Sequence, residues 1–413
     1  MATGWTLRCV TCGRTEARDR FTCSVCGDLL GTLDVLYQPS RKVSLGAPGA
    51  GLFRLSALLP VSADGPRPPL LVGDTPMYEA PKIARRLGVA GMFVKDEGRN
   101  PSASMKDRAT AVALAHAASI GCTTVAAAST GNAAASLSTL AASMGMRAVI
   151  FVPRTAPAPK VAQMLLTGAS VVMVDGNYDQ AFDLCAEAVR RFGWYSRNTA
   201  TNPFLAEGKK TCSIEIAEYF QFVPPDVIAV GVGDGCVFGA QHKAFVDLLA
   251  TGLVKTMPRL VGVQAAGADP LARAFAKGRD TCEPMEPCTF ADSISVGVPR
   301  DQVKALRAAR ATGGAIVAVP DDRIREAMRM LASELGVFAE PAGAAGLAGL
   351  LELADRGGLR PSDRVVAIVS GHGLKDIKGA MSAVRGAPMQ VEPGPKALDA
   401  LEAIAHCPIG LPP

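Results

Sequence analysis

The chain has 413 residues, of which 49% are hydrophobic, 20% charged and only 5% aromatic, and its formal net charge is +5. This length and composition indicate a globular protein with a large buried core, organised as more than one structural unit. Its positive charges are scattered and aromatic residues are few, so the basic face and stacking platforms typical of nucleic-acid recognition are missing. We therefore expect no nucleic-acid partner.

The N-terminal segment has no apolar core of the kind found in secretory signals. The most apolar stretches, such as residues 227–233, are much shorter than a bilayer span. Seven of the eleven cysteines stand alone in apolar or helical segments, unlike the framework of a disulfide-stabilised secreted protein. These features predict a cytoplasmic protein with no membrane association.

The remaining four cysteines form two Cys-x-x-Cys pairs near the N-terminus: Cys9, Cys12, Cys23 and Cys26. Paired knuckles of this kind can direct four thiolates at one ion, which favours a structural zinc site closed by protein ligands. Two coincidental pairs of free thiols are the alternative. We predict a zinc ribbon over residues 1–40, bounded by the proline- and glycine-rich stretch at 38–69.

From about residue 75, short apolar runs alternate with longer helical patterns such as 106–120 and 132–145. The apolar runs lie at 91–95, 124–128, 148–152, 170–174, 227–233, 260–266, 315–319 and 365–371. Apolar strands separated by helices are typical of α/β folds whose parallel sheets are covered on both faces. Ligands of such sheets lie beyond the carboxyl ends of the strands, and the polar motifs described next all fall there.

The segment NPSASMKDR, residues 100–108, places Lys106 at the start of a predicted helix, after a turn of small polar residues. The positive end of a helix disfavours the charged form of an adjacent amine, and the neutral amine is the form that makes a Schiff base. Lys106 is therefore a candidate catalytic residue. On this motif alone, a lysine in such a position is more often an ordinary surface residue.

A second motif, ASTGNAA at residues 128–134, follows a buried strand and opens a helix. Hydroxyls and backbone amides at a helix N-terminus bind anions, and a substrate carboxylate would fit there. The candidate substrate-binding residues are Ser129, Thr130, Gly131, Asn132 and Ala133. Asn132 could also donate to an oxygen of a cofactor ring. An ordinary helix cap is the alternative interpretation.

A third motif, GVGDGCVFG at residues 231–239, again runs from a strand through glycines into a helix. Glycines at alternate positions let backbone amides close around a dianionic phosphate. The spacing is not that of a dinucleotide fingerprint, so NAD is disfavoured. The fourth motif, VSGHGLKD, places Ser370 after the last strong strand, where a neutral hydroxyl could meet a pyridine nitrogen. His372 in the same motif fits an ordinary loop histidine.

In this order, the four motifs resemble those of fold-type II pyridoxal 5′-phosphate (PLP) enzymes, and those of threonine synthases most closely. The resemblance covers about residues 75–380 and includes NPFLAEGKKT at 202–211 and FAEPAGAAGLAGL at 338–350. Many threonine synthase-like proteins also begin with a four-cysteine ribbon. The resemblance implies two interleaved α/β/α lobes within residues 41–385, with the smaller lobe at about 115–200, and a tail at 386–413.

The resemblance also implies a role for each motif. Lys106 would hold PLP and move protons, Asn132 would meet the phenolic oxygen of the cofactor, and Ser370 would meet its ring nitrogen. The cofactor phosphate would be bound by Gly231, Val232, Gly233, Asp234, Gly235 and Cys236. The partners implied are a small amino-acid substrate, phosphorylated in the nominal case, and a second copy of the chain in a homodimer.

The nominal reaction is the conversion of O-phosphohomoserine to threonine. Threonine synthases usually carry an Asn-Ser pair and a phosphate-binding arginine around the Asn-Pro motif, where this chain has Thr199, Ala200 and Leu205. Leucine cannot replace a bidentate phosphate clamp. Three nearby cations could compensate: Arg197, Lys209 and Lys210. The alternative is a β-eliminating or β-replacing enzyme, such as a serine/threonine dehydratase, a cysteate synthase-like enzyme or a specialised-metabolite amino-acid synthase. A non-catalytic scaffold is disfavoured because Lys106 and the loops are intact.

Overall fold

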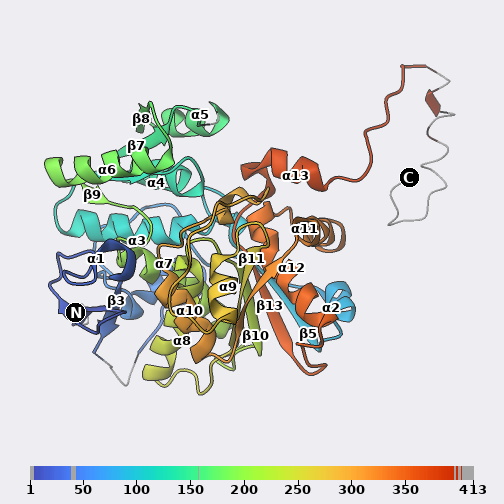
Figure 1. The fold of residues 1–413 in the computed structure, drawn as a ribbon, viewed down its shortest axis with the longest axis horizontal. Helices are drawn as coiled ribbons and strands as arrows, with labels where there is room; N and C mark the ends of the chain where they lie inside the picture. Colours follow the sequence, from blue (N-terminus) through green and yellow to red (C-terminus); the bar gives the residue numbers. More distant parts are fainter. Residues whose placement is uncertain (1–3, 39–42, 157, 395–396, 399–400, 402–413) are drawn as a thin grey trace.

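The computed structural model describes residues 4–38, 43–156, 158–394, 397–398 and 401. Three sheets organise these residues, one of six strands, one of four and one of three. Helices surround the two larger sheets, and the three-stranded sheet lies on the N-terminal side of the molecule (Figure 1). The α/β architecture with parallel sheets that the sequence predicted is confirmed.

The six-stranded sheet is parallel except at one edge. In spatial order its strands are β12 (Ala315–Val319), β11 (Arg259–Ala265), β10 (Val227–Gly231), β13 (Arg364–Val369), β5 (Gly91–Asp96) and β4 (Met77–Glu79). β4 pairs antiparallel with β5, and the other neighbours pair in parallel. The apolar runs predicted in this part of the chain each form one strand, whereas the short β4 was not predicted.

Side chains of the central strands alternate between two apolar clusters, because a strand points successive residues to opposite faces. On β10, Val227 and Ala229 belong to one cluster, and Ile228 and Val230 to the other. The first cluster includes residues of α2 (Pro81–Leu87), α11 (Asp321–Leu335) and α12 (Pro341–Asp355). The second includes residues of α7 (Phe204–Tyr219), α8 (Cys236–Ala250), α9 (Pro270–Ala276) and α10 (Gln302–Ala311).

The four-stranded sheet is entirely parallel and has the order β8 (Ser170–Val174), β7 (Arg147–Pro153), β6 (Thr124–Ala128) and β9 (Tyr195–Ser196). Val125 and Ile150 share a cluster with residues of α3 (Lys106–Ser119), α4 (Asn132–Ser143) and α5 (Ala158–Leu166). Ala126 and Phe151 point the other way and pack with α6 (Tyr178–Phe192). Both sheets are therefore buried on two faces.

The N-terminal module, residues 4–37, is an antiparallel sheet with a short helix. It contains β1 (Trp5–Cys9), β2 (Thr15–Glu16), α1 (Gly27–Leu30) and β3 (Leu33–Tyr37). Trp5, Leu7 and Val35 belong to the same apolar cluster as residues of α3 and α4. Lys304 Nζ on α10 also donates to the backbone oxygen of Leu33 at 2.8 Å. The module is thus packed onto the body of the protein.

Short helical segments complete the described structure: η1 (Leu52–Leu58), η2 (Glu97–Arg99), η3 (Asp292–Ile294), η4 (Gly373–Lys375) and α13 (Ile377–Ala383). Most of the predicted tail beyond residue 394 lies outside the described residues, as do residues 39–40 of the predicted ribbon. Within the described part of the chain, none of the helices combines the length and apolarity needed to cross a bilayer.

A buried charge network fixes the start of α3. Arg108 donates to both carboxylate oxygens of Glu97, at 2.6 and 2.8 Å, and to both of Glu215, at 2.6 and 2.7 Å. Lys95 Nζ on β5 donates to Glu215 at 2.7 Å. All four side chains are at most 4% exposed. Two cations thus balance two carboxylates and join α3 to β5 and α7.

Glu215→Gln tests this network, because it keeps the shape of the side chain and removes one negative charge. The two buried cations would then share one carboxylate, so we expect the free energy of unfolding to fall by about 3–5 kcal/mol. Urea denaturation measures the change. The matched control is Glu187→Gln, which breaks an exposed ion pair with Arg190 and should cost less than about 1 kcal/mol. Equal losses in the two variants would contradict the assignment.

His116 on α3 provides a pH-dependent test of how the N-terminal module packs. Its ring stacks on Phe204 with centroids 3.7 Å apart and lies edge-on to Trp5. Burial lowers the pKa of His116 to about 4. An unfolded chain therefore takes up a proton near pH 6.5 that the native protein accepts only near pH 4, so native stability falls as the pH drops through this window.

We expect His116 to contribute a loss of about 3 kcal/mol between neutral pH and about pH 4. His116→Phe retains the packing and removes the titration, so its denaturation midpoint should depend less on pH over this range. The measurement is urea denaturation of both proteins at several pH values. Parallel pH profiles for the two proteins would refute this expectation.

Candidate functional site

Lys106 is the first residue of α3 and follows a loop that pairs with the chain after β13. The backbone nitrogen of Met105 donates to Ser370 O at 2.8 Å, and that of His372 donates to Ala103 O at 3.0 Å. Ala103 has φ of 63°, a left-handed conformation that costs energy for a residue other than glycine. The structure therefore brings the predicted residues Lys106 and Ser370 close together, through a turn held in a strained shape.

The buried side chain of Asp107 holds the same turn through hydrogen bonds. Its carboxylate accepts hydrogen bonds from Ser102 N at 2.6 Å and from Ser102 Oγ at 2.5 Å. Burial raises the pKa of Asp107, and the two hydrogen bonds from Ser102 oppose that shift. Sequence reasoning missed this role, although the Ser-x-x-x-x-Asp spacing in SASMKD contains it. Asp107 thus positions the backbone immediately before Lys106.

Lys106 is half-buried, and its surroundings lower the pKa of its amine. Burial is the largest cause and the positive charge of Arg197 is the next, whereas Cys236, Glu340 and Asp234 act in the opposite direction. The lowered pKa has the direction predicted from the sequence, and burial and Arg197 are the causes that lower it. A lowered pKa increases the fraction of neutral amine, which is the nucleophilic form.

The predicted substrate loop lies between β6 and α4. Ser129 Oγ accepts a hydrogen bond from Gly131 N at 3.2 Å, and Asn198 Oδ1 anchors the end of β6 by accepting from Ala128 N at 2.8 Å. The amides of residues 130, 132 and 133 donate no hydrogen bond to any described residue. An added Cβ on Gly131 would meet no atom within 4 Å. Free amides at a helix N-terminus beside open space fit a carboxylate ligand.

Asn132 links this loop to the segment before α12, which packs on the six-stranded sheet. Its Nδ2 donates to both carboxylate oxygens of Glu340, at 2.9 and 3.0 Å. Glu340 immediately precedes α12, and its own backbone nitrogen donates to Gly371 O at 3.0 Å. Burial raises the pKa of Glu340, and Asn132 and Lys106 oppose that shift. Sequence reasoning assigned no role to Glu340, although the Glu-Pro-Ala-Gly signal lies within a segment that supported the family resemblance.

The predicted phosphate loop connects β10 to α8. The amides of residues 233–236 donate no hydrogen bond to any described residue, whereas Val232 N already donates to Val263 O at 2.8 Å. Gly235 has φ of 95°, and an added Cβ there would lie 2.8 Å from the backbone oxygen of Asp301. The Asp234 carboxylate accepts from Arg300 N at 3.2 Å and thus shapes the loop. Four free amides before a helix suit a phosphate, and Val232 packs in the core instead.

These features together fit PLP. Ser104 Oγ is buried and finds no partner among the described residues. Buried polar groups left unpaired cost free energy, and a polar, anionic ligand would relieve that cost. Lys106 would hold the cofactor, the amides of residues 233–236 would receive its phosphate, and Ser370 lies within the same group of loops.

The position expected to carry a phosphate-binding arginine is apolar in the structure. Leu205 is 1% exposed and belongs to the same cluster as Phe204. Of the three cations considered as replacements, Lys210 is engaged elsewhere, because it pairs with Glu207 and with Asp247. Arg197 and Lys209 make no such ion pair within the described residues.

The four N-terminal cysteines form a compact cluster. Their sulfur atoms all lie within 4.8 Å of one another, and the sulfurs of Cys12 and Cys23 are 3.7 Å apart. Gly13 and Gly27 each follow a Cys-x-x-Cys pair and have φ of 74° and 69°, which lets the backbone turn around the sulfurs. Four converging thiols are a suitable ligand set for a tetrahedral metal ion.

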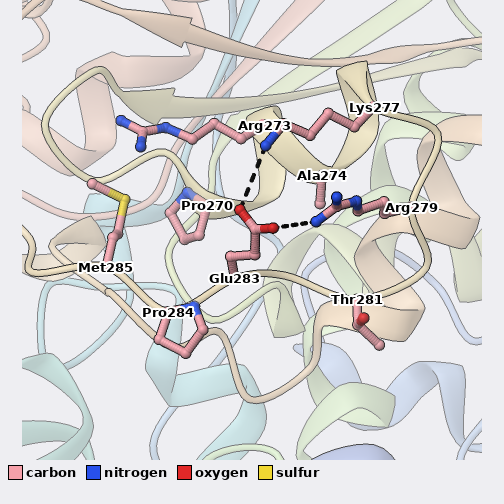
Figure 2. Close-up of a pocket in the computed structure, with 9 residues that line it drawn as sticks. All are labelled: Pro270, Arg273, Ala274, Lys277, Arg279, Thr281, Glu283, Pro284 and Met285. Carbon is pink, nitrogen blue, oxygen red and sulfur yellow. Dashed lines mark hydrogen bonds and ion pairs between the residues drawn. The ribbon is translucent and has the colours of Figure 1, made fainter.

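A surface hollow next to α9 is unrelated to these loops. Figure 2 shows its lining, with the carboxylate of Glu283 between Lys277 and Arg279. None of the predicted site residues lines it. Glu283 pairs with both Lys277 and Arg279, and Arg273 pairs with Asp269.

Comparison with known proteins agrees with the geometry. A model of the pyridoxal-phosphate dependent enzyme family matches residues 69–371. The threonine synthase of Methanocaldococcus jannaschii is 37% identical over 383 residues, which are 91% of this chain and 94% of that protein. The threonine synthase of Methanosarcina acetivorans is 37% identical over 382 residues, and that of Mycobacterium tuberculosis 35% over 338 residues. These matches cover 90% and 81% of this chain, and 92% and 91% of the two relatives.

Solved structures share the fold at lower identity. Maize serine racemase has a TM-score of 0.64 and 23% identity, covering 80% of this chain and 93% of that one. Diaminopropionate ammonia lyase from Escherichia coli has a TM-score of 0.65 and 18% identity, covering 93% of this chain and 97% of that one. The lysine, the free amides and the matches together lead to one conclusion: the chain belongs to the pyridoxal-phosphate dependent enzyme family, as a threonine synthase-like lyase of fold type II.

Proposed function

We propose that this enzyme converts O-phosphohomoserine and water to threonine and inorganic phosphate. The observation that supports this most is the 37% identity to threonine synthase across 91% of the chain, together with the position of Lys106 between the two lobes. In this reaction protons leave Cα and Cβ, phosphate leaves Cγ, protons are added at Cγ and back at Cα, and water adds its hydroxyl at Cβ. The net change breaks one carbon–oxygen bond and forms another.

Each group of site residues would have its own role in this reaction. PLP, when bound, supplies an electron sink that stabilises negative charge at the substrate carbons. The amine of Lys106 would take and return protons, helped by a lowered pKa. The free amides at the start of α4 would hold the substrate carboxylate, with Ser129 and Thr130 beside them. The hydroxyl of Ser370 would face the ring nitrogen, and Asn132 the phenolic oxygen.

The alternative function is β-elimination or β-replacement on serine, threonine or an activated analogue. The apolar Leu205 favours it, because the arginine that would bind a substrate phosphate is missing there. A dehydratase would release a ketoacid and ammonia, whereas a β-replacing enzyme would combine its substrate with an external nucleophile. The products therefore distinguish these reactions from threonine formation.

Three further features belong to the same proposal. The cysteine cluster would bind structural zinc and make the N-terminal module a zinc ribbon, because its sulfurs converge at metal-ligand spacing. The enzyme would act in the cytoplasm, where free thiols persist. It would form a homodimer, as the resemblance to its family implies.

The activity prediction concerns the holoenzyme. Supplied with O-phosphohomoserine, it should release phosphate and threonine in equal amounts, whereas Lys106→Ala should lose at least about a thousandfold in rate because its proton-transferring amine is gone. Borohydride reduction followed by peptide mapping should place the cofactor on Lys106. Ketoacid from serine or threonine without phosphate release from O-phosphohomoserine would favour the alternative. A label on another lysine would refute the site.

The zinc prediction concerns the N-terminal module. Purified protein should contain about one zinc per chain, and Cys9→Ser should release it, because structural sites need all four thiolates. Cys9 is buried in the cluster shared with Trp5, so thermal stability should also fall. Metal analysis and thermal denaturation measure the two effects. Cys122→Ser, outside the cluster, is the control and should retain the metal.

A further inference from the structure

Arg197 is a buried cation next to Lys106 with part of its guanidinium unsatisfied. Its side chain is 1% exposed, and its Nε donates to Thr110 Oγ1 at 3.1 Å. Thr110 lies one helical turn after Lys106 on α3, so the guanidinium is held on the same side of that helix as the amine. Nη2 of Arg197 finds no partner among the described residues. The unsatisfied end of Arg197 is thus free to receive an anion.

Lys209 is a second buried cation without a counter-ion. It lies on α7, is 2% exposed, and its Nζ forms no hydrogen bond or ion pair with a described residue. Its neighbour Gly208 touches α3, because an added Cβ there would lie 2.0 Å from the backbone oxygen of Arg108. That contact places the Lys209 turn of α7 beside the start of α3.

The other deeply buried cations in this region are all paired. Each has a carboxylate oxygen within 2.7 Å: Lys95, Arg108, Lys210 and Lys243. Burying a cation without a partner costs several kcal/mol. Two buried cations that both lack a carboxylate partner therefore indicate a binding site for an anion. The carboxylate that acts on the pKa of Arg197, that of Asp107, already accepts two hydrogen bonds from Ser102.

The pKa values agree with this geometry. Burial lowers the pKa of Arg197 to about 10 and that of Lys209 to about 8. Lys106 and Arg197 both lower the pKa of Lys209 further, while Cys236 and Asp301 act against them. The three cations are therefore close enough to repel one another. A bound dianion would remove that repulsion.

Arg197 belongs to the substrate side of the site. Its backbone nitrogen donates to Ala126 O on β6 at 2.8 Å, and the next residue, Asn198, anchors Ala128. The same strand carries the predicted substrate loop, whereas the free amides for the cofactor phosphate lie on the other lobe, before α8. Lys209 lies one turn after Leu205, on the same face of α7. Lys209 thus supplies a positive charge one helical turn away from Leu205, the position where an arginine was expected.

We propose that Arg197 and Lys209 form a subsite for a phosphate ester group of the substrate, adjacent to Lys106. The inference rests on the proposed function, since it concerns the leaving group of that reaction. It selects a phosphorylated amino acid over free serine or threonine. Arg197 would bind two phosphate oxygens through its guanidinium, and Lys209 would add a point charge.

The test compares two ligands of equal carbon-chain length, by calorimetry on the holoenzyme and by the absorbance of the bound cofactor. The probes are 2-amino-5-phosphonopentanoate, in which a methylene replaces the ester oxygen, and norvaline, which lacks the phosphonate. We expect the wild-type protein to bind the phosphonate at least about tenfold more tightly. Arg197→Gln and Lys209→Gln should each reduce that ratio about tenfold, with little change for norvaline.

Two variants keep the result interpretable. Arg154→Gln removes an exposed arginine, 73% exposed, and should retain the wild-type ratio. Lys209→Arg preserves the charge and should retain most of the preference for the phosphonate over norvaline. Together with Lys209→Gln, it tests the subsite even if Arg197→Gln fails to fold. Equal affinity of the wild-type protein for the two ligands would overturn the subsite.

Weaker binding of PLP itself in the glutamine variants, with an unchanged ligand ratio, would also overturn it and assign both cations to the cofactor phosphate. A protein that binds no PLP would instead contradict the proposed function, while calorimetry with the phosphonate would still report on the subsite. The two failures are therefore distinguishable.

Discussion

The buried pairing of Arg108 with Glu97 and Glu215 is the constraint on which the catalytic centre depends. Arg108 lies two residues after Lys106, so fixing its guanidinium also fixes the first turn of α3. The carboxylates come from η2, directly after β5, and from α7, and Lys95 completes the charge balance. Because such a network is stable only when each charge keeps its partners, the start of α3 has one permitted position. Because Lys106 is the first residue of α3, the same network fixes its backbone.

The site is assembled from loops of both larger sheets. Asn132 opens α4, after β6 of the four-stranded sheet, and donates to Glu340, which precedes α12 on the six-stranded sheet. Glu340 is joined through its backbone to Gly371, next to Ser370, and Met105 pairs with Ser370 as well. A movement of one sheet with its helices against the other would therefore change the surroundings of Lys106 through these hydrogen bonds. The geometry suits an enzyme that must bring a substrate loop toward a fixed amine.

Sequence reasoning recovered the features that local pattern encodes. Apolar runs such as 124–128 and 227–233 formed strands, and each glycine-rich loop lay beyond the end of its strand. Features set by contacts between distant segments were out of reach. Glu340 meets Asn132 across 208 positions, and Val232 uses its amide within the sheet despite lying in the phosphate motif. Whether a cation is paired also depends on the fold: Lys209 and Lys210 are adjacent in sequence, yet only Lys210 meets carboxylates within the described chain.

The N-terminal module packs against aromatic residues that flank Arg197 in the sequence. Trp5 packs edge-on against Phe204 with centroids 5.5 Å apart, and Phe21 packs against Tyr195 at 5.2 Å. Tyr195 and Phe204 lie on either side of Arg197 in the sequence. The module therefore helps to bury the segment around Arg197, whose side chain is 1% exposed. A cation kept in so dry a setting interacts strongly with any anion that reaches it, since little solvent remains to screen the charge.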